Sequence, residues 1–123
     1  MTAKKCIQKL LRFKGLKVVD FVFEGSRRLI ILVKPHKNGC LCPVCGRRCE
    51  IVWTLPEVRW WRDIPAAGWE VWLQYCPREI RCPTHGRRQE EIPWARSHAR
   101  ATYRYEYLML RYCQMMPQNG AGT

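Results

Sequence analysis

Two short turns of the same design stand forty positions apart in the sequence, Cys-Pro-Val-Cys-Gly at 42–46 and Cys-Pro-Thr-His-Gly at 82–86. Each turn presents two metal-binding side chains at positions i and i+3. Its glycine lets the chain pass close behind the ligand atoms, so that backbone N–H groups can donate hydrogen bonds to sulfur. Zn²⁺ prefers four tetrahedral ligands drawn from thiolate and imidazole. The two turns therefore predict one zinc ion, bound by Cys42, Cys45, Cys82 and His85.

Such a Cys3His set is closed, because four protein ligands leave no position for water, and closed sites are structural rather than catalytic. A small metal-dependent hydrolase would need an open metal position beside a general base, so the ligand set argues against that class. A local alternative stays open, in which the four cysteines between 40 and 49 chelate one ion or a cluster. That alternative leaves the 82–86 turn unexplained, and we therefore interpret Cys40 and Cys49 as neighbours of the site.

The length of 123 residues fits one domain, or a small domain with an appendage. The N-terminal residues contain no apolar run long enough for a signal peptide, and no stretch is long enough to span a bilayer. We therefore expect no membrane association and a reducing, cytoplasmic environment. There, clustered cysteines, of which this chain has eight in all, bind metal more often than they form disulfides.

Hydrophobic patterning predicts two β-hairpins. Runs rich in β-branched and aromatic residues pair across short turns, at about 16–23 with 28–34 and at 58–64 with 69–75. The second hairpin carries four tryptophans, which we expect to cover a thin β-core. Some of them could instead stack on unpaired bases.

A helical pattern follows the second turn, with apolar residues at intervals of three and four from about His98 or Thr102 to Met116. The expected fold class is therefore α+β, a small zinc ribbon in which zinc pins the two β-hairpins and one C-terminal helix follows. This divides the chain into a β-rich zinc-ribbon domain at 1–97, a C-terminal helix at 98–116 and a flexible tail at 117–123.

The charge of the chain points to a polyanionic partner. Lysine and arginine number 22 against 10 acidic residues, which gives a formal net charge of +12. Every lysine lies at or before Lys37, and from Arg47 onward the chain uses arginine in place of lysine. The planar guanidinium suits bidentate contacts to phosphate and guanine, so the later part of the chain is the better candidate for a recognition surface. Alternatively, this usage reflects a GC-rich coding sequence.

Two groups of arginines are candidate nucleic-acid contacts. The first group flanks the two turns, where one zinc ion would gather it at one end of the ribbon: Arg47, Arg48, Arg81, Arg87 and Arg88. The second group falls on one side of the C-terminal helix if that helix extends back past His98: Arg96, Arg100, Arg104 and Arg111. The alternative for the second group is an ordinary solvated helical face.

Five motifs taken in order resemble a known family. They are Cys-Pro-Val-Cys-Gly at 42–46, Arg-Asp-Ile-Pro at 62–65, Cys82, Glu-Ile-Pro-Trp-Ala at 91–95 and Thr102. This order is similar to the N-terminal zinc-binding region of bacterial transposases of the insertion-sequence "L three" family. In that family a helical DNA-binding segment begins near the threonine.

The resemblance covers roughly residues 10 to 112. It departs from the family at His85, where a second cysteine is usual, and at Pro77, which interrupts a commonly continuous strand. Family members continue into a nuclease domain with an acidic triad and divalent metal, whereas this chain ends at Thr123 with scattered acidic residues.

The resemblance therefore implies a DNA-end recognition module without strand cleavage, in a bacterial cytoplasm and associated with the nucleoid. Duplex DNA, such as transposon ends, is the expected partner. The second hypothesis keeps the same fold but makes it a protein-interaction adaptor, or an inhibitor, of a transposase or another nuclease.

Overall fold

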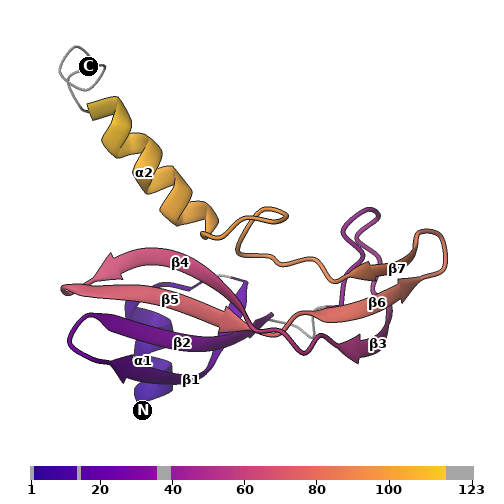
Figure 1. Cartoon of the computed structure of the whole chain (residues 1–123), viewed down its shortest axis with the longest axis horizontal. Coiled ribbons are helices and arrows are strands. Elements are labelled where there is room, and N and C mark those ends of the chain that lie inside the picture. Colours follow the sequence, from indigo (N-terminus) through magenta and orange to yellow (C-terminus); the bar gives the residue numbers. More distant parts are fainter. Residues whose placement is uncertain (1, 14, 36–39, 116–123) are drawn as a thin grey trace.

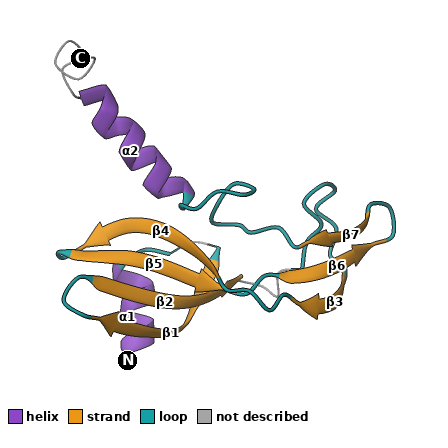
Figure 2. Ribbon diagram, viewed as in Figure 1, coloured by secondary structure: helices purple, strands orange, loops and turns teal. Residues whose placement is uncertain are grey.

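The structure is a computed structural model that describes residues 2–13, 15–35 and 40–115. Within these residues, two helices and seven strands form a mixed α+β fold with two separate sheets and a C-terminal helix (Figures 1 and 2). The elements are α1 (Ala3–Leu10), β1 (Leu16–Glu24), β2 (Arg28–Pro35), β3 (Glu50–Thr54), β4 (Arg59–Ala66), β5 (Trp69–Tyr75), β6 (Arg78–Cys82), β7 (Gly86–Gln89) and α2 (Tyr103–Met115).

The larger sheet has four strands in the order β1-β2-β5-β4, and it contains both hairpins that the sequence predicts. The turn between β4 and β5 has positive φ at Ala67 (50°) and Gly68 (85°). Two such residues make a tight turn whose twist matches the flanking strands. The hairpins are joined to each other by parallel pairing of β2 with β5, which the sequence pattern did not reveal.

The smaller sheet has three antiparallel strands in the order β3-β6-β7. It lies beside the larger sheet, and the chain passes from β5 to β6 through Cys76 and Pro77 (Figure 1). Both predicted metal-binding turns border this smaller sheet. An ion held by them would therefore fasten the smaller sheet, rather than pin the two hairpins as expected from the sequence, because pairing of β2 with β5 already joins those.

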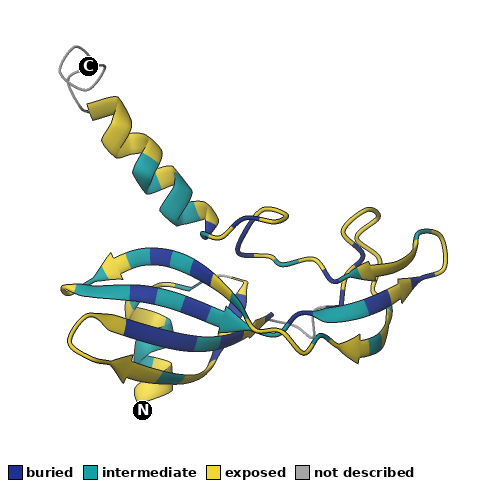
Figure 3. Ribbon diagram, viewed as in Figure 1, coloured by how far each residue is buried: buried dark blue, intermediate teal, exposed yellow. Residues whose placement is uncertain are grey.

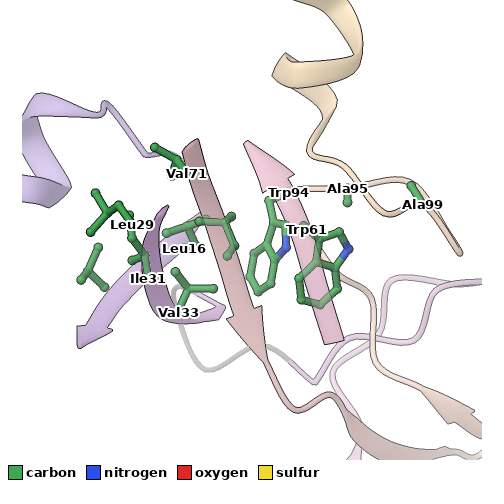
Figure 4. Close-up of a cluster of buried hydrophobic side chains, with 11 residues drawn as sticks. Leu16, Leu29, Ile31, Val33, Trp61, Val71, Trp94, Ala95 and Ala99 are labelled. Carbon is green, nitrogen blue, oxygen red and sulfur yellow. The ribbon is translucent and has the colours of Figure 1, made fainter. Parts of the chain in front are cut away.

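The main core lies on one face of the larger sheet, under α1 and residues 92–99 (Figures 3 and 4). Trp61 of β4 is fully buried, and its ring meets that of Trp94 edge to face at a centroid distance of 5.3 Å. Such pairs add to the stabilisation from burial alone. Trp61 therefore packs in the core, as expected, whereas Trp60 is 38% exposed.

Helix α2 begins at Tyr103, directly after Thr102, whose hydroxyl accepts a hydrogen bond from the backbone N–H of Tyr105 at 3.2 Å. The earlier start at His98 was wrong, because His98 has a φ of 62° and cannot continue a right-handed helix. Arg96 and Arg100 consequently precede the helix. Met116 and residues 117–123, which the sequence assigns to the helix end and a tail, lie outside the described residues.

No residue of α2 is buried, and the helix projects away from the larger sheet (Figure 3). Among the described residues, neither helix is both long and apolar enough to cross a membrane.

A buried carboxylate fixes the start of α2. Asp63 is fully buried in β4 and accepts hydrogen bonds from the Thr102 hydroxyl and the Arg104 Nε, both at 2.8 Å. Arg104 also donates from Nη1 to the carbonyl of Leu11, just after α1, at 2.6 Å. Arg104, which the sequence suggested as a DNA contact, therefore joins three parts of the fold.

We expect Arg104→Ala to lower the free energy of unfolding by about 2–3 kcal/mol, because the Asp63 carboxylate would remain buried without its cationic partner. The loss is smaller than for a fully enclosed pair, since the Arg104 side chain is 34% exposed and water can reach its place. Urea unfolding measures the change, with exposed Arg111→Ala as the control. Unchanged stability together with a lost DNA sequence preference would instead support base reading by Arg104.

Candidate metal centre and its basic surroundings

The four predicted ligands converge on one point. The sulfur atoms of Cys42, Cys45 and Cys82 and a ring nitrogen of His85 all lie within 4.8 Å of one another. Three of the separations are 3.7 Å from Cys42 Sγ to His85 Nδ1, 3.5 Å from Cys82 Sγ to the same nitrogen, and 3.7 Å from Cys45 Sγ to Cys82 Sγ. Zn–S bonds of about 2.3 Å give tetrahedral edges of about 3.8 Å. The donor set therefore fits one tetrahedral ion.

The local backbone explains why the two turns present their ligands this way. In the first turn, the N–H of Gly46 donates to the carbonyl of Cys42, and the N–H of Cys42 donates to the carbonyl of Arg47, both at 2.9 Å. Gly46 and Gly86 have φ values of 72° and 75°, a region that other residues rarely adopt. Each glycine therefore lets its turn close tightly behind the ligands.

The same turns stabilise two of the three thiolates. Burial alone would raise the pKa of Cys82, but hydrogen bonds from the backbone N–H groups of His85 and Thr84 and from neighbouring thiols outweigh it and lower the pKa to about 7. For Cys42 too, burial is outweighed by backbone N–H groups, including that of Val44 at 3.4 Å, and its pKa is lowered. For Cys45 the N–H of Arg47 lowers the pKa, but burial and the neighbouring thiols outweigh that bond and raise it. Deprotonated sulfur is the form that binds metal, so the turns favour that form at Cys42 and Cys82.

Cys40 and Cys49 have other contacts. The Cys49 thiol donates to the carbonyl of Arg47 at 3.2 Å, and Cys40 is buried with its backbone N–H donating to Glu90 at 3.2 Å. Within the part of the chain that the structure describes, neither belongs to the group of converging ligand atoms. This arrangement favours the shared four-ligand site over the local cluster of cysteines.

A buried ion pair connects the smaller sheet, beside the candidate centre, to the larger sheet. The side chain of Glu90 is fully buried and accepts hydrogen bonds from the Tyr75 hydroxyl (2.6 Å), the Arg78 Nε (3.0 Å) and the Cys40 N–H (3.2 Å). Burial would raise the pKa of Glu90, but the bonds from Arg78 and Tyr75 outweigh it and lower that pKa. No pattern in the sequence distinguishes Glu90 from Glu91.

The first predicted group of arginines surrounds the smaller sheet. All five are exposed; two directly follow the first turn, and three lie on β6 and β7. Arg87 pairs with Glu79 at 3.0 Å. The other four form no ion pair with any residue that the structure describes: Arg47, Arg48, Arg81 and Arg88. Their charges are available to an anion.

The second predicted group does not form a single stripe. Arg96 precedes α2 and makes a bidentate pair with Glu106, with Nη2 to Oε2 at 2.7 Å. Arg100 is exposed in the loop before the helix, while Arg104 is held by Asp63. Arg111 lies exposed near the far end of α2 and donates to the Tyr107 hydroxyl at 3.4 Å. Only Arg104 and Arg111 of the four belong to the helix.

The chain is similar in sequence to insertion-sequence transposases. It is 35% identical over 99 residues to the transposase for insertion sequence element IS1557 of Mycobacterium tuberculosis, covering 76% of this chain and 22% of that protein. It is 32% identical over 107 residues to the transposase for insertion sequence element IS1001 of Bordetella parapertussis, covering 85% of this chain and 26% of that protein. No protein-family model and no solved structure matches it. The chain is therefore related to insertion-sequence transposases and spans about a quarter of their length.

Proposed function

We propose that this chain is a zinc-stabilised, nucleic-acid-binding module of transposase origin that recognises DNA ends and has no nuclease activity of its own. The observation that carries the proposal is the convergence of three sulfurs and one imidazole beside a sheet whose surface bears arginines that form no ion pair with the described residues. The similarity of this chain to transposases, which act on DNA, supports DNA as its partner. The motif order of the insertion-sequence "L three" family supports a DNA-end module in particular.

In this proposal zinc has a structural role. Cys42, Cys45, Cys82 and His85 would hold one ion in a closed tetrahedral site, and the ion would supply the cross-link between the two turns that the small sheet needs. Four protein ligands leave no position for a substrate. The closed set supports a binding role for this metal centre rather than strand cleavage.

The arginines around the smaller sheet would bind phosphates. Arg47 and Arg48 follow the first turn, and Arg81, Arg87 and Arg88 lie on β6 and β7, so a bound ion would fix all five on one rigid unit. A rigid backbone at these positions removes the cost of ordering the chain, so that only the arginine side chains lose conformational entropy when they contact a phosphate. Such a module belongs in the bacterial cytoplasm, in association with the nucleoid.

We expect Arg47→Ala and Arg88→Ala each to weaken binding to all duplexes alike. Each should lower the slope of log K against log salt by about 0.9, because each phosphate contact releases about one counterion. Fluorescence anisotropy of the zinc-loaded protein with random and with inverted-repeat duplexes, at several salt concentrations, measures both quantities.

The matched control is Arg27→Ala, because Arg27 is exposed in the turn between β1 and β2, in the larger sheet. It should leave the slope unchanged. A parent protein that does not bind DNA at low salt would contradict the nucleic-acid function, and binding to a transposase or nuclease that salt does not weaken would establish the adaptor in its place.

A further inference from the structure

Two adjoining hollows lie where β4, β7 and the loop before α2 meet. The first has a volume of about 400 Å³ and the second about 540 Å³, and both are lined by Arg59, Gln89 and His98. Arg88 lines the first hollow, while Trp60 and Arg100 line the second. We call the two together the arginine cleft. Its size is that of a site for a small organic ligand rather than for a single ion.

The charge of the arginine cleft is positive. Arg59, Arg88 and Arg100 form no ion pair within the described residues, and the Arg96 guanidinium at the rim is paired with Glu106. Two carboxylates border the cleft: Glu90, which is buried and already occupied by Arg78 and Tyr75, and the exposed Glu91, so the arginines still outnumber the acidic residues. Arg59 is half-buried, and burial lowers its pKa. A bound anion would offset the cost of burying that charge.

One wall also offers aromatic surface. Trp61 lines the first hollow, but its side chain is fully buried and the Arg59 guanidinium lies over its ring at 4.9 Å from the centroid, so this ring is closed to a base. The ring of Trp60, 38% exposed, borders the second hollow. An exposed aromatic ring at a basic cleft can stack on a base.

The loop that closes the cleft is held in an unfavourable conformation. His98, which lines both hollows, has a φ of 62°, where side chains other than glycine are strained. Backbone hydrogen bonds fix the loop on either side of His98. The N–H of Ala99 donates to the carbonyl of Arg96 at 3.1 Å, and the N–H of Arg62 donates to the carbonyl of Arg100 at 2.9 Å. The fold thus maintains a conformation that presents the imidazole to the cleft.

From this combination we infer that the arginine cleft binds one unpaired nucleotide of a DNA strand. The guanidinium groups of Arg59, Arg88 and Arg100 take its phosphates, and its base lies against the exposed ring of Trp60 with His98 beside it. The inference rests on the proposed function, since it places a frayed or overhanging DNA end next to the arginines that hold the duplex. It adds a preference for unpaired ends that phosphate contacts alone do not give.

The test uses hairpin DNAs that share one stem and differ only at the open end. The end is blunt, carries a single 2-aminopurine overhang, or carries a single abasic overhang, in both strand polarities. Anisotropy gives the affinity of the zinc-loaded protein for each, and 2-aminopurine fluorescence reports stacking. We expect the base-bearing overhang of one polarity to bind about fivefold or more tighter than the abasic one, with quenched fluorescence.

Two variants separate the cleft from the rest of the molecule. Arg59→Gln removes a charge, and His98→Gly removes the imidazole while keeping a backbone conformation that glycine adopts without strain. In each variant the base-bearing and abasic overhangs should bind with about equal affinity. The affinity of His98→Gly for the blunt end should change by less than about twofold. Arg27→Gln is the control that retains the preference. Equal binding of all three ends with intact salt-dependent binding would overturn this inference alone, whereas no binding to any DNA would overturn the proposed function as well.

Discussion

Replacing Cys82 with Ser is expected to abolish zinc binding and to unfold the smaller sheet. Cys82 contributes the thiol whose pKa is lowered to about 7, and it ends β6 at the turn that carries His85. The smaller sheet has little apolar burial of its own, because the buried cluster there consists of Ile80 with Cys40, Cys42 and Cys82. Structural zinc contributes about 10–16 kcal/mol in small metal-dependent folds, far more than one buried isoleucine supplies.

Metal content per chain, measured by mass spectrometry of the purified protein, should fall from about one zinc to none. The larger sheet should persist, because its core of eleven buried residues is separate from the smaller cluster. Circular dichroism and hydrogen exchange of the Cys82→Ser protein should therefore show protected amides in β1, β2, β4 and β5 and unprotected amides in β6 and β7. The same pattern is expected when a chelator removes the ion from the parent protein.

Two other cysteines provide matched controls. Cys49→Ser changes a thiol that lies next to the candidate centre but outside the ligand group, and Cys6→Ser changes one in α1. Both proteins should keep their zinc. A Cys82→Ser protein that still binds one zinc would refute the shared site, and zinc lost from Cys49→Ser would point to the local cluster of cysteines.

The ligands and the hairpins could be predicted because short-range patterns determine them. Spacing of i and i+3 with a closing glycine specifies a metal-binding turn, and alternation of buried and exposed residues specifies strands such as β5, where Val71 and Leu73 are fully buried. By contrast, β7 is Gly-Arg-Arg-Gln and has no apolar alternation. It is a strand because it pairs with β6 beside the two turns, which is a tertiary reason.

The arrangement of the pieces was not predictable, because long-range contacts decide it. Parallel pairing of β2 with β5 joins hairpins that local pattern treats as independent. The proposed helical stripe failed for a similar reason. Arg104 has the spacing of a surface residue, yet the buried Asp63, 41 positions earlier in the chain, pairs with it. Sequence spacing shows which side chains share a face of a helix, but it does not show which of them will pair with a buried residue from another part of the chain.

Replacing Glu90 with Gln is expected to lower the free energy of unfolding by about 3–5 kcal/mol, because the change leaves the Arg78 charge in a largely buried place without its carboxylate. The Arg78 side chain is 24% exposed and that of Glu90 is fully buried, so little water can replace the lost charge. Glutamine has nearly the same volume, and the loss therefore reports charge and hydrogen bonding rather than a cavity. Urea unfolding at neutral pH, followed by tryptophan fluorescence, measures it.

The pH dependence of the stabilisation by Glu90 follows from the direction in which its pKa is shifted. The pKa of Glu90 is lowered in the folded protein, so its stabilisation is fully present above the unfolded value of about 4.5 and is lost as the pH falls through the lowered folded value. The penalty of Glu90→Gln should therefore stay constant from pH 8 to about pH 5.

Glu91→Gln is the matched control, because the Glu91 side chain, next in sequence to Glu90, is exposed. It should change the free energy of unfolding by less than about 0.5 kcal/mol. Unlike Cys82→Ser, the Glu90→Gln protein should still bind one zinc, because the carboxylate contacts the N–H of Cys40 and none of the four ligands. The loss of stability in Glu90→Gln should be local to the segment where β5 passes into β6. It should appear as faster amide exchange at Arg78, whose N–H donates to the Glu90 carboxylate at 2.8 Å. If Glu90→Gln unfolds at the same urea concentration as the parent, this ion pair does not join the two sheets, and the turn through Cys76 and Pro77 must hold them together by itself.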